Sequence, residues 1–236
     1  PYLVHKIWGG SKLKKLKKTI PIENSQSSLP LGETWEVSCL ADGASILNGV
    51  SLSQCVNACD LPYIVKFIDT SDNLSVQVHP DDEYAKINEN QSGKTECWLI
   101  LDADQDSGIY LGLKPDLNQH DLKTALKDQN KRSEDKNFSQ LLNFYPVKTG
   151  QFFYVPAGTI HAIGKNVTLV EIQQSSGVTY RVWDWNRVDE NGKARKLHIK
   201  KALDVINFEY SQNTKESFLF KNDVLSCCGA KVLIEH

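Results

Sequence analysis

Four polar residues in three short motifs have the chemistry of a divalent-metal site. Gln77 and His79 stand two residues apart in LSVQVHPDD, so they point to the same face if this segment is a strand. Glu96 lies in GKTECWLIL, and His161 follows a Pro-Ala-Gly turn in GQFFYVPAGTIH. Zinc accepts imidazole nitrogen together with carboxylate and amide oxygen. The four side chains would therefore bind one ion, provided that the three motifs face the interior of the same barrel.

Each of these residues, taken singly, also fits a position without a ligand. A lone histidine in a β protein is more often a hydrogen-bonded polar residue than a metal ligand. Lys94 shares a face with Glu96, and the two would equally form an exposed ion pair of little energetic value. Arg181 would equally be a structural partner of Asp184. The metal site thus depends on the fold bringing the motifs together.

Runs of β-branched and aromatic residues predict that strands carry these motifs. The runs are ETWEVSCL (33–40), YIVKFID (63–69), LSVQVHP (74–80), TECWLILDA (95–103) and SGIYLGL (107–113). Further strands are predicted in GQFFYVPAG, VTLVEIQQ and TYRVWDW. In the last of these, Trp183 and Trp185 alternate with polar residues, which favours core packing over a platform for a sugar.

Two regions have helical spacing instead. Between Pro115 and Phe144, the apolar residues predict two surface helices joined by the charged loop DQNKRSEDK. A further helix is predicted near 195–208, whereas the acidic DDE after Pro80 is interpreted as a turn. Many short strands with Gly and Pro turns indicate a mainly β fold, a jelly-roll or barrel with a few added α-helices.

The motif around His161 resembles the second sequence motif of cupins, whose jelly-roll fold binds a metal inside the barrel. The first cupin motif usually carries HxH with a glutamate shortly after it. Here Gln77 takes the place of the first histidine, and Glu96 follows seventeen residues after His79. Together, IWGG, LSVQVHPDD, GKTE, YVPAGTIHA and EIQQSSGVTYR resemble the type I phosphomannose isomerases, in their short bacterial form. This resemblance extends from about residue 5 to residue 200.

The resemblance implies a role for each candidate residue. It places the ligands of one Zn²⁺ ion per chain on four residues: Gln77, His79, Glu96 and His161. It places the active-site arginine on Arg181, with Lys94 in the same pocket. Glu171, on the same predicted hairpin as Arg181, is a candidate base, and a zinc-bound water or the surroundings of His79 are the alternatives. Ser75 falls on a position that lines the same pocket, and it is a candidate substrate-binding residue. Trp8 in IWGG is a second candidate for a wall of the pocket, although an aromatic residue near glycines equally fits plain packing.

The activity implied by the resemblance is the interconversion of mannose 6-phosphate and fructose 6-phosphate, in mannose metabolism. A proton moves between C1 and C2 through a cis-enediol, so negative charge develops on the sugar oxygens. Two alternatives use the same pocket: a cupin oxygenase with Fe(II), and a non-catalytic sugar-binding regulatory barrel. Gln77 as a fourth ligand argues against the first alternative, and the joint presence of Lys94 and Arg181 argues against the second.

Composition and charge argue against several other classes of function. A formal charge of −2 and a pI near 6.3 argue against bulk binding to nucleic acid or to membranes, and the lysine-rich stretch 11–19 is interpreted as a solvated segment. No apolar run approaches the length of a membrane span, and the first residues do not resemble a signal peptide. Six cysteines without a CxxC pair predict reduced thiols in a cytoplasmic protein. The expected partner is a small sugar phosphate, and the expected state is a monomer or weak homodimer.

The sequence predicts a catalytic cupin domain over 1–208, with a helical insert at about 115–145. Residues 209–236 are interpreted as the remnant of a second, smaller cupin-like β domain, because they are too few for a full jelly-roll. The absence of methionine from all 236 residues adds to the expectation that segments are missing there, and the stretch 47–61 also looks shorter than its counterpart in the family that the chain resembles.

Overall fold

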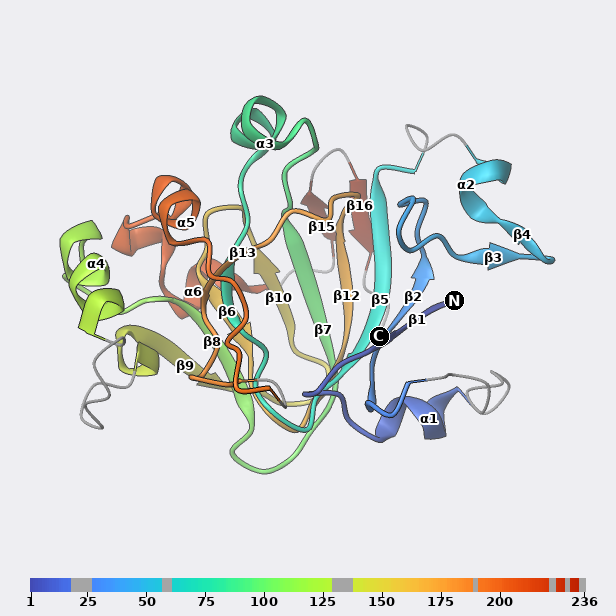
Figure 1. Ribbon diagram of the computed structural model, residues 1–236, viewed down its shortest axis with the longest axis horizontal. Coiled ribbons are helices and arrows are strands. Elements are labelled where there is room, and N and C mark those ends of the chain that lie inside the picture. The colour runs from blue at the N-terminus through green and yellow to red at the C-terminus, as the bar shows by residue number, and fades with distance from the viewer. Residues whose placement is uncertain are drawn as a thin grey trace.

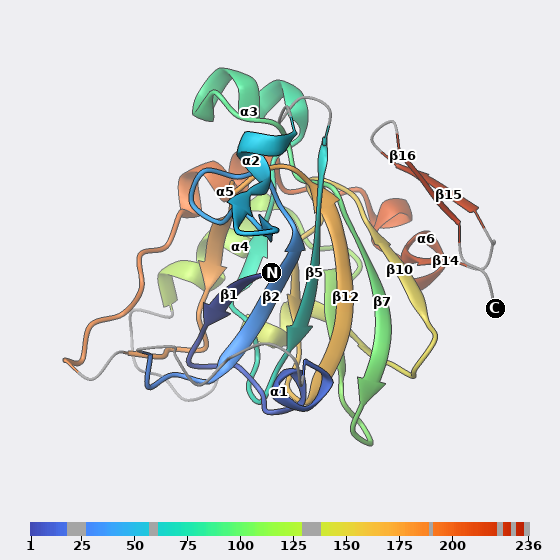
Figure 2. The same ribbon diagram turned by 90° about the vertical axis from the view of Figure 1, so that its right-hand side faces the viewer.

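Most strands of this chain belong to two antiparallel sheets that face each other (Figures 1 and 2). The computed structural model describes residues 1–17, 27–56, 61–128, 138–188 and 191–220, and the backbone of 224–227 and 230–233. The larger sheet has the order β1-β2-β5-β12-β7-β10-β14, and the smaller sheet has the order β13-β6-β11-β8-β9. The mainly β fold with added helices is therefore confirmed.

The strands of the large sheet are β1 (Tyr2–His5), β2 (Leu31–Val37), β5 (Tyr63–Asp69), β7 (Glu96–Ala103), β10 (Phe152–Val155), β12 (Val167–Gln174) and β14 (Leu219–Phe220). Those of the small sheet are β6 (Val76–Val78), β8 (Gly108–Leu113), β9 (Leu142–Pro146), β11 (His161–Ile163) and β13 (Tyr180–Trp183). Two separate hairpins are β3 (Ile46–Leu47) with β4 (Val50–Ser51), and β15 (Val224–Cys227) with β16 (Ala230–Leu233).

The described helices are short and lie outside the sheets. They are α1 (Lys12–Leu16), α2 (Leu52–Cys55), α3 (Asp82–Glu89), α4 (Gln119–Asp128), α5 (Ile199–Val205) and α6 (Lys215–Phe218), with 3₁₀ turns η3 (Phe138–Leu141) and η4 (Tyr210–Gln212). None of them combines the length and the apolar character that a helix needs to cross a bilayer.

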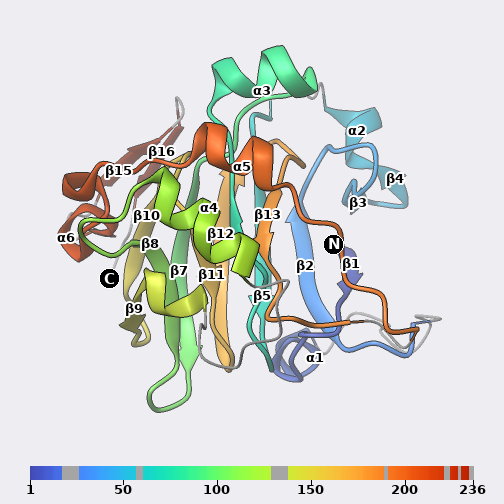
Figure 3. The ribbon, with the colours of Figure 1, turned by 60° about the vertical axis from the view of Figure 1, so that its left-hand side comes forward.

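Apolar residues are buried on both faces of the small sheet. Between the two sheets, Trp98 and Phe153 of the large sheet pack with Leu111 of the small one. On the other face of the small sheet, a second cluster joins Val76 and its neighbours to α4 and α5, which cover that face (Figure 3). Each fully buried aliphatic or aromatic side chain contributes about 1.5–3 kcal/mol to folding. The site described below lies between the sheets, where its residues are held by this packing.

Several local expectations differ from the structure. The first helix predicted between 115 and 144 is α4, but the second is wrong, because Phe138–Leu141 forms a 3₁₀ turn and Leu142 starts β9. Spacings of three and four residues also suit a turn whose apolar side chains meet the core, and Phe138 is buried there. The loop DQNKRSEDK lies almost wholly outside the described residues.

The acidic residues after Pro80 begin a helix rather than forming only a turn. The Asp81 side chain accepts a hydrogen bond from the backbone N–H of Tyr84, which caps α3. The lysine-rich stretch also contains a short helix, α1, in which Leu13 is buried while Lys14 and Lys15 are exposed. Its last two residues lie outside the described part of the chain.

Residues just after 208 contribute to the main body. The strand β14 pairs with β10 at the edge of the large sheet, and Phe218 is fully buried between the sheets. The division of the chain at 208 stays a prediction.

Candidate metal centre and adjoining pocket

Strand pairing aligns polar residues across the interior of the protein. In the small sheet, Gln77 is the register partner of His161 on one side and of Arg181 on the other. In the large sheet, Lys66 lies directly opposite Glu171. These pairings join segments up to about a hundred residues apart in sequence. They place the polar residues of the small sheet and those of the large sheet in the space between the two sheets.

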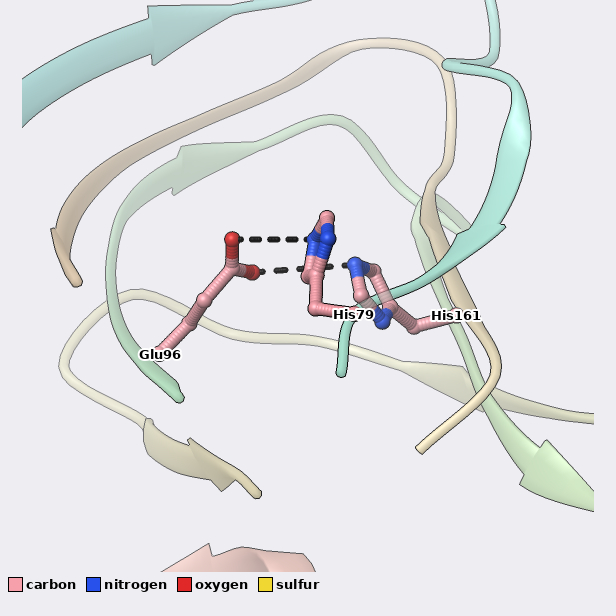
Figure 4. A group of neighbouring side chains, drawn as sticks. All are labelled: His79, Glu96 and His161. Atoms are coloured by element: carbon pink, nitrogen blue, oxygen red, sulfur yellow. Dashed lines mark ion pairs between the residues drawn. The ribbon is translucent and has the colours of Figure 1, made fainter. Parts of the chain in front are cut away.

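Three of the four predicted metal ligands converge at one end of this space (Figure 4). Nε2 of His79 lies 3.2 Å from Oε1 of Glu96, and Nε2 of His161 lies 3.6 Å from Oε2 of the same carboxylate. The candidate ligand atoms all lie within 4.8 Å of one another, and all three residues are buried. This spacing suits donors that surround a single metal ion.

The two histidines are oriented by their outer nitrogens. Nδ1 of His79 donates a hydrogen bond to the carbonyl of Val178 (2.9 Å), and Nδ1 of His161 donates to the carbonyl of Thr159 (2.9 Å). A hydrogen on Nδ1 leaves the Nε2 lone pair free to bind a metal. Burial, reinforced by the nearby Lys94 ammonium, lowers the pKa of His79 to about 3, and burial lowers the pKa of His161. Both imidazoles are therefore neutral near pH 7, as metal ligation requires.

Glu96 supplies the negative charge of this cluster. Both of its carboxylate oxygens are buried and receive no hydrogen bond from a described residue, although the Lys94 ammonium forms an ion pair with Oε1 at 2.7 Å. Burial raises the pKa of Glu96, but the Lys94 ammonium opposes this effect, and the pKa is held well below its usual range. A buried carboxylate without hydrogen bonds is costly unless a cation satisfies it. The residues present therefore fit a divalent metal ion.

Gln77 lies beside this group, with its Nε2 atom 3.4 Å from Nε2 of His161. Rotation of the amide by half a turn exchanges its nitrogen and oxygen, which would present Oε1 as a fourth metal-ligating atom. The structure thus brings all four predicted ligands together.

Two glycines allow the chain to hold these residues. A Cβ on Gly93 would lie 2.4 Å from the backbone carbon of Asp81, so only glycine lets the GKTE motif approach the start of α3 so closely. Gly158 has φ +84°, and its N–H donates to the carbonyl of His79 (2.8 Å). The Pro-Ala-Gly turn is thereby tied to one histidine while it leads into the strand that carries the other.

A pocket of about 250 Å³ adjoins the metal centre. Its walls include every predicted catalytic and substrate-binding residue: Arg181, Lys94, Glu171, Ser75 and Trp8. Five cationic side chains and two carboxylates line it: Lys6, Lys66, Lys94, Arg181, Arg195, Glu33 and Glu171. The excess of positive charge suits an anionic ligand.

The alternative interpretations of Lys94 and Arg181, as an exposed ion-pair partner and as a structural partner of Asp184, are wrong. Lys94 and Glu96 are not an exposed ion pair, since their relative exposures are 6% and 1%. Arg181 does not pair with Asp184, because Arg187 and Arg195 bind both oxygens of that carboxylate. Nη1 of Arg181 instead donates to the carbonyl of Lys196 (3.0 Å), while its buried Nε has no hydrogen-bond partner in the described chain.

Lys66 is one of the pocket residues that sequence reasoning missed. Its ammonium lies 3.3 Å from Oε1 of Glu171, donates to Gln173 at 2.6 Å and lies over the Trp35 ring. Burial opposes its charge, but Glu171 and Glu33 outweigh that effect, so the pKa of Lys66 is raised. A signal was present, because Lys66 interrupts the apolar face that Ile64 and Ile68 form on β5.

Glu171 faces the pocket with both oxygens in contact. Oε2 accepts from the indole N–H of Trp98 at 3.0 Å, and Lys66 contacts Oε1. Burial and the nearby Glu96 carboxylate raise the pKa of Glu171 to about 6.

The aromatic residues divide between the core and the pocket. Trp183 is buried in the cluster beneath α4 and α5, and Trp185 packs against that cluster, so the prediction of core packing is confirmed. Trp8 is also buried, and it lines the pocket as part of the core between the sheets.

Comparison with known proteins gives several relatives with one activity. The chain is 37% identical over 230 residues to the mannose-6-phosphate isomerase of Streptococcus mutans, which covers 91% of this chain and 68% of the relative. It is 38% identical over 222 residues to the mannose-6-phosphate isomerase ManA of Bacillus subtilis, covering 87% and 66% respectively. The chain spans about two thirds of the length of these relatives. No protein-family model matches the chain.

Solved structures show the same fold. The crystal structure of the mannose 6-phosphate isomerase from Bacillus subtilis aligns with a TM-score of 0.75 at 29% identity, covering 99% of this chain and 74% of that one. A mannose 6-phosphate isomerase bound with zinc and yttrium aligns with a TM-score of 0.63 at 15% identity, covering 96% and 77%.

Proposed function

This chain belongs to the mannose-6-phosphate isomerase family, and we propose that it interconverts mannose 6-phosphate and fructose 6-phosphate with one zinc ion per chain. The observation that carries the proposal is the buried cluster of His79, Glu96 and His161 beside a pocket of excess positive charge. The same proposal sets aside the oxygenase and the regulatory barrel, because the relatives are isomerases.

We propose Gln77, His79, Glu96 and His161 as the residues that hold the zinc. One carboxylate and three neutral donors leave the ion with a net positive charge, so bound zinc would act as a Lewis acid on the sugar oxygens. The carbonyls of Val178 and Thr159 keep the two imidazoles in the tautomer that offers Nε2.

Negative charge that develops on the sugar is balanced by fixed cations. Lys94 lies among the ligand atoms, with its ammonium 3.3 Å from Nε2 of His79. Arg181 stays charged at all working pH values and can bind two oxygens at once, so it suits the enediolate or the phosphate. Lys6 and Arg195 line the same pocket and add to its affinity for a phosphate dianion.

Glu171 is proposed as the general base that moves the proton between C1 and C2. Its pKa of about 6 makes it a carboxylate at neutral pH that still has useful basicity. The ammonium of Lys66 and the indole of Trp98 hold the carboxylate in place from the side of the large sheet. Loss of the carboxylate should therefore affect turnover far more than binding.

A coupled assay that follows fructose 6-phosphate formation from mannose 6-phosphate tests the proposal. Glu171→Gln keeps the shape of the side chain, and we expect kcat to fall by about 10²–10⁴ with little change in zinc content. Arg181→Lys should keep zinc and lose turnover, because a single ammonium cannot replace the guanidinium fork. The exposed Glu209→Gln is the matched control. No turnover by the zinc-loaded wild type, or iron in place of zinc after purification, would overturn the proposal.

A further inference from the structure

The pocket residue Arg181 is held by the short segment that precedes α5. The backbone N–H of His198 donates to the carbonyl of Arg181 at 2.8 Å. In return, the backbone N–H of Arg181 donates to Nδ1 of His198 at 3.1 Å. The guanidinium donates to the carbonyl of Lys196 at 3.0 Å. Three hydrogen bonds from residues 196–198 therefore hold the backbone and the side chain of Arg181.

The bond to Nδ1 defines the protonation state of His198. A nitrogen that accepts a hydrogen bond from an N–H group carries no proton, so the imidazole is neutral with its hydrogen on Nε2. Protonation would place a second hydrogen on Nδ1, facing the N–H of Arg181, and would replace attraction by repulsion. The other contacts of Arg181 offer little compensation, because its buried Nε has no hydrogen-bond partner among the described residues.

We infer that His198 is a positioning residue, whose neutral imidazole sets the place of Arg181 and whose protonation weakens binding of the sugar phosphate. The inference rests on the proposed function through the role of Arg181. His198 does not line the pocket, so it acts on the substrate only through Arg181.

The charges around His198 favour its neutral form. Arg181 on β13 and Lys196 and Lys201 on its own segment are cationic, whereas the Glu89 carboxylate on α3 opposes them. Glu89 is itself engaged, since it accepts from Lys201 and from the hydroxyl of Tyr180, each at 2.6 Å. The Tyr180 ring also packs beside the imidazole.

Partial burial, together with these cations, lowers the pKa of His198 below 6.5. The imidazole therefore stays neutral near pH 7 and gains its proton only as the pH falls below 6.5. Substrate binding should then weaken on the acid side of the pH profile.

Two substitutions distinguish the loss of the hydrogen-bond acceptor at position 198 from the loss of its titratable group. His198→Asn places an amide oxygen near the position of Nδ1 and does not protonate, whereas His198→Ala removes the acceptor. We expect His198→Ala to raise KM about tenfold, the effect of one lost hydrogen bond of about 1–1.5 kcal/mol. His198→Asn should restore KM to within about twofold of wild type. Zinc content and the thermal unfolding midpoint, measured alongside, show that each variant is folded and loaded.

The pH profile supplies a readout that a purely structural role would not move. The phosphate of the substrate has a pKa near 6, so KM changes in acid for every variant. The ratio of KM between wild type and His198→Asn cancels this shared effect, and we expect it to rise as the pH falls below 6.5. The exposed Lys200→Gln on the same helix is the control, and its ratio to wild type should stay constant.

A spectroscopic measurement tests the inference without turnover. The sequence contains only four arginines, Arg132, Arg181, Arg187 and Arg195, so ¹⁵N-arginine labelling gives a simple spectrum of backbone amides. The signal of Arg181, assigned with Arg181→Lys, should shift with pH in the wild type and stay fixed in His198→Asn. A shifting signal in a wild type without isomerase activity would overturn the proposed function alone. A signal that does not follow pH, or a constant KM ratio in an active enzyme, would overturn the role of His198.

Discussion

Replacing Glu96 by glutamine tests whether the metal centre is a buried charge cluster. The variant keeps the shape of the side chain and removes the charge that faces Lys94 at 2.7 Å. At an effective dielectric constant of about 20, two charges at that distance interact by about 6 kcal/mol before desolvation is counted. Removal of one partner of a buried pair costs about 3–5 kcal/mol, because the other charge stays buried and unpaired. For a chain of this size, the loss corresponds to a fall of about 6–20 °C in Tm.

The assay is urea unfolding of metal-free protein in chelator at neutral pH. The metal must be removed because zinc bound to wild type would stabilise its folded state, and this binding free energy would add to the measured difference between wild type and variant. A double variant, Glu96→Gln with Lys94→Met, should recover most of the loss of about 3–5 kcal/mol, because it replaces a lone buried charge by an apolar side chain. Glu209→Gln, which removes an exposed carboxylate, should stay within about 0.5 kcal/mol of wild type.

Zinc titration of the same variants gives the second half of the test. Glu96→Gln should lose stoichiometric zinc, because only neutral donors remain around the ion. The reasoning is refuted if the metal-free variant is as stable as wild type, since Lys94 and Glu96 would then not be a desolvated pair. Retention of one tightly bound zinc would refute the ligand assignment instead.

Three further perturbations test the surroundings of the site. Gly158→Ala should lower the free energy of unfolding by about 1–3 kcal/mol, because its φ of +84° is strained for alanine, and an unchanged urea midpoint would contradict this. Asp184→Asn should cost about 1.5–3 kcal/mol and raise KM, since Arg187 and Arg195 both lose a charged acceptor, and equal stability would show that the arginines find other partners. Metal-free protein should lose up to about 1.4 kcal/mol per pH unit through His79 as the pH falls below 6.5. In the unfolded chain the histidine takes up a proton below pH 6.5, whereas in the folded protein the pKa of His79 is about 3. The contribution of His79 to the free energy of unfolding is therefore complete above pH 6.5 and is lost as the pH falls toward 3. The dependence of that free energy on pH should be weaker in His79→Gln.

The sequence determined the chemistry of the site. The two-residue spacing of Gln77 and His79 and the glycines of the GKTE and Pro-Ala-Gly motifs are local features, and the structure keeps them. The strand β5 has the predicted bounds for the same reason, because alternation along one segment depends only on that segment. Local spacing was less reliable near Phe138, where one pattern suits both a helix and a turn against the core.

Only the tertiary structure decided how the charges are paired and how deeply they are buried. The chain alone allowed Lys94 and Glu96 to be exposed and Arg181 to pair with Asp184, and both interpretations are wrong. Lys66 became part of the site only when β5 was placed beside β12. The physical reason is that the free energy of a charge depends on its neighbours in space, and pairing between distant strands supplies those neighbours.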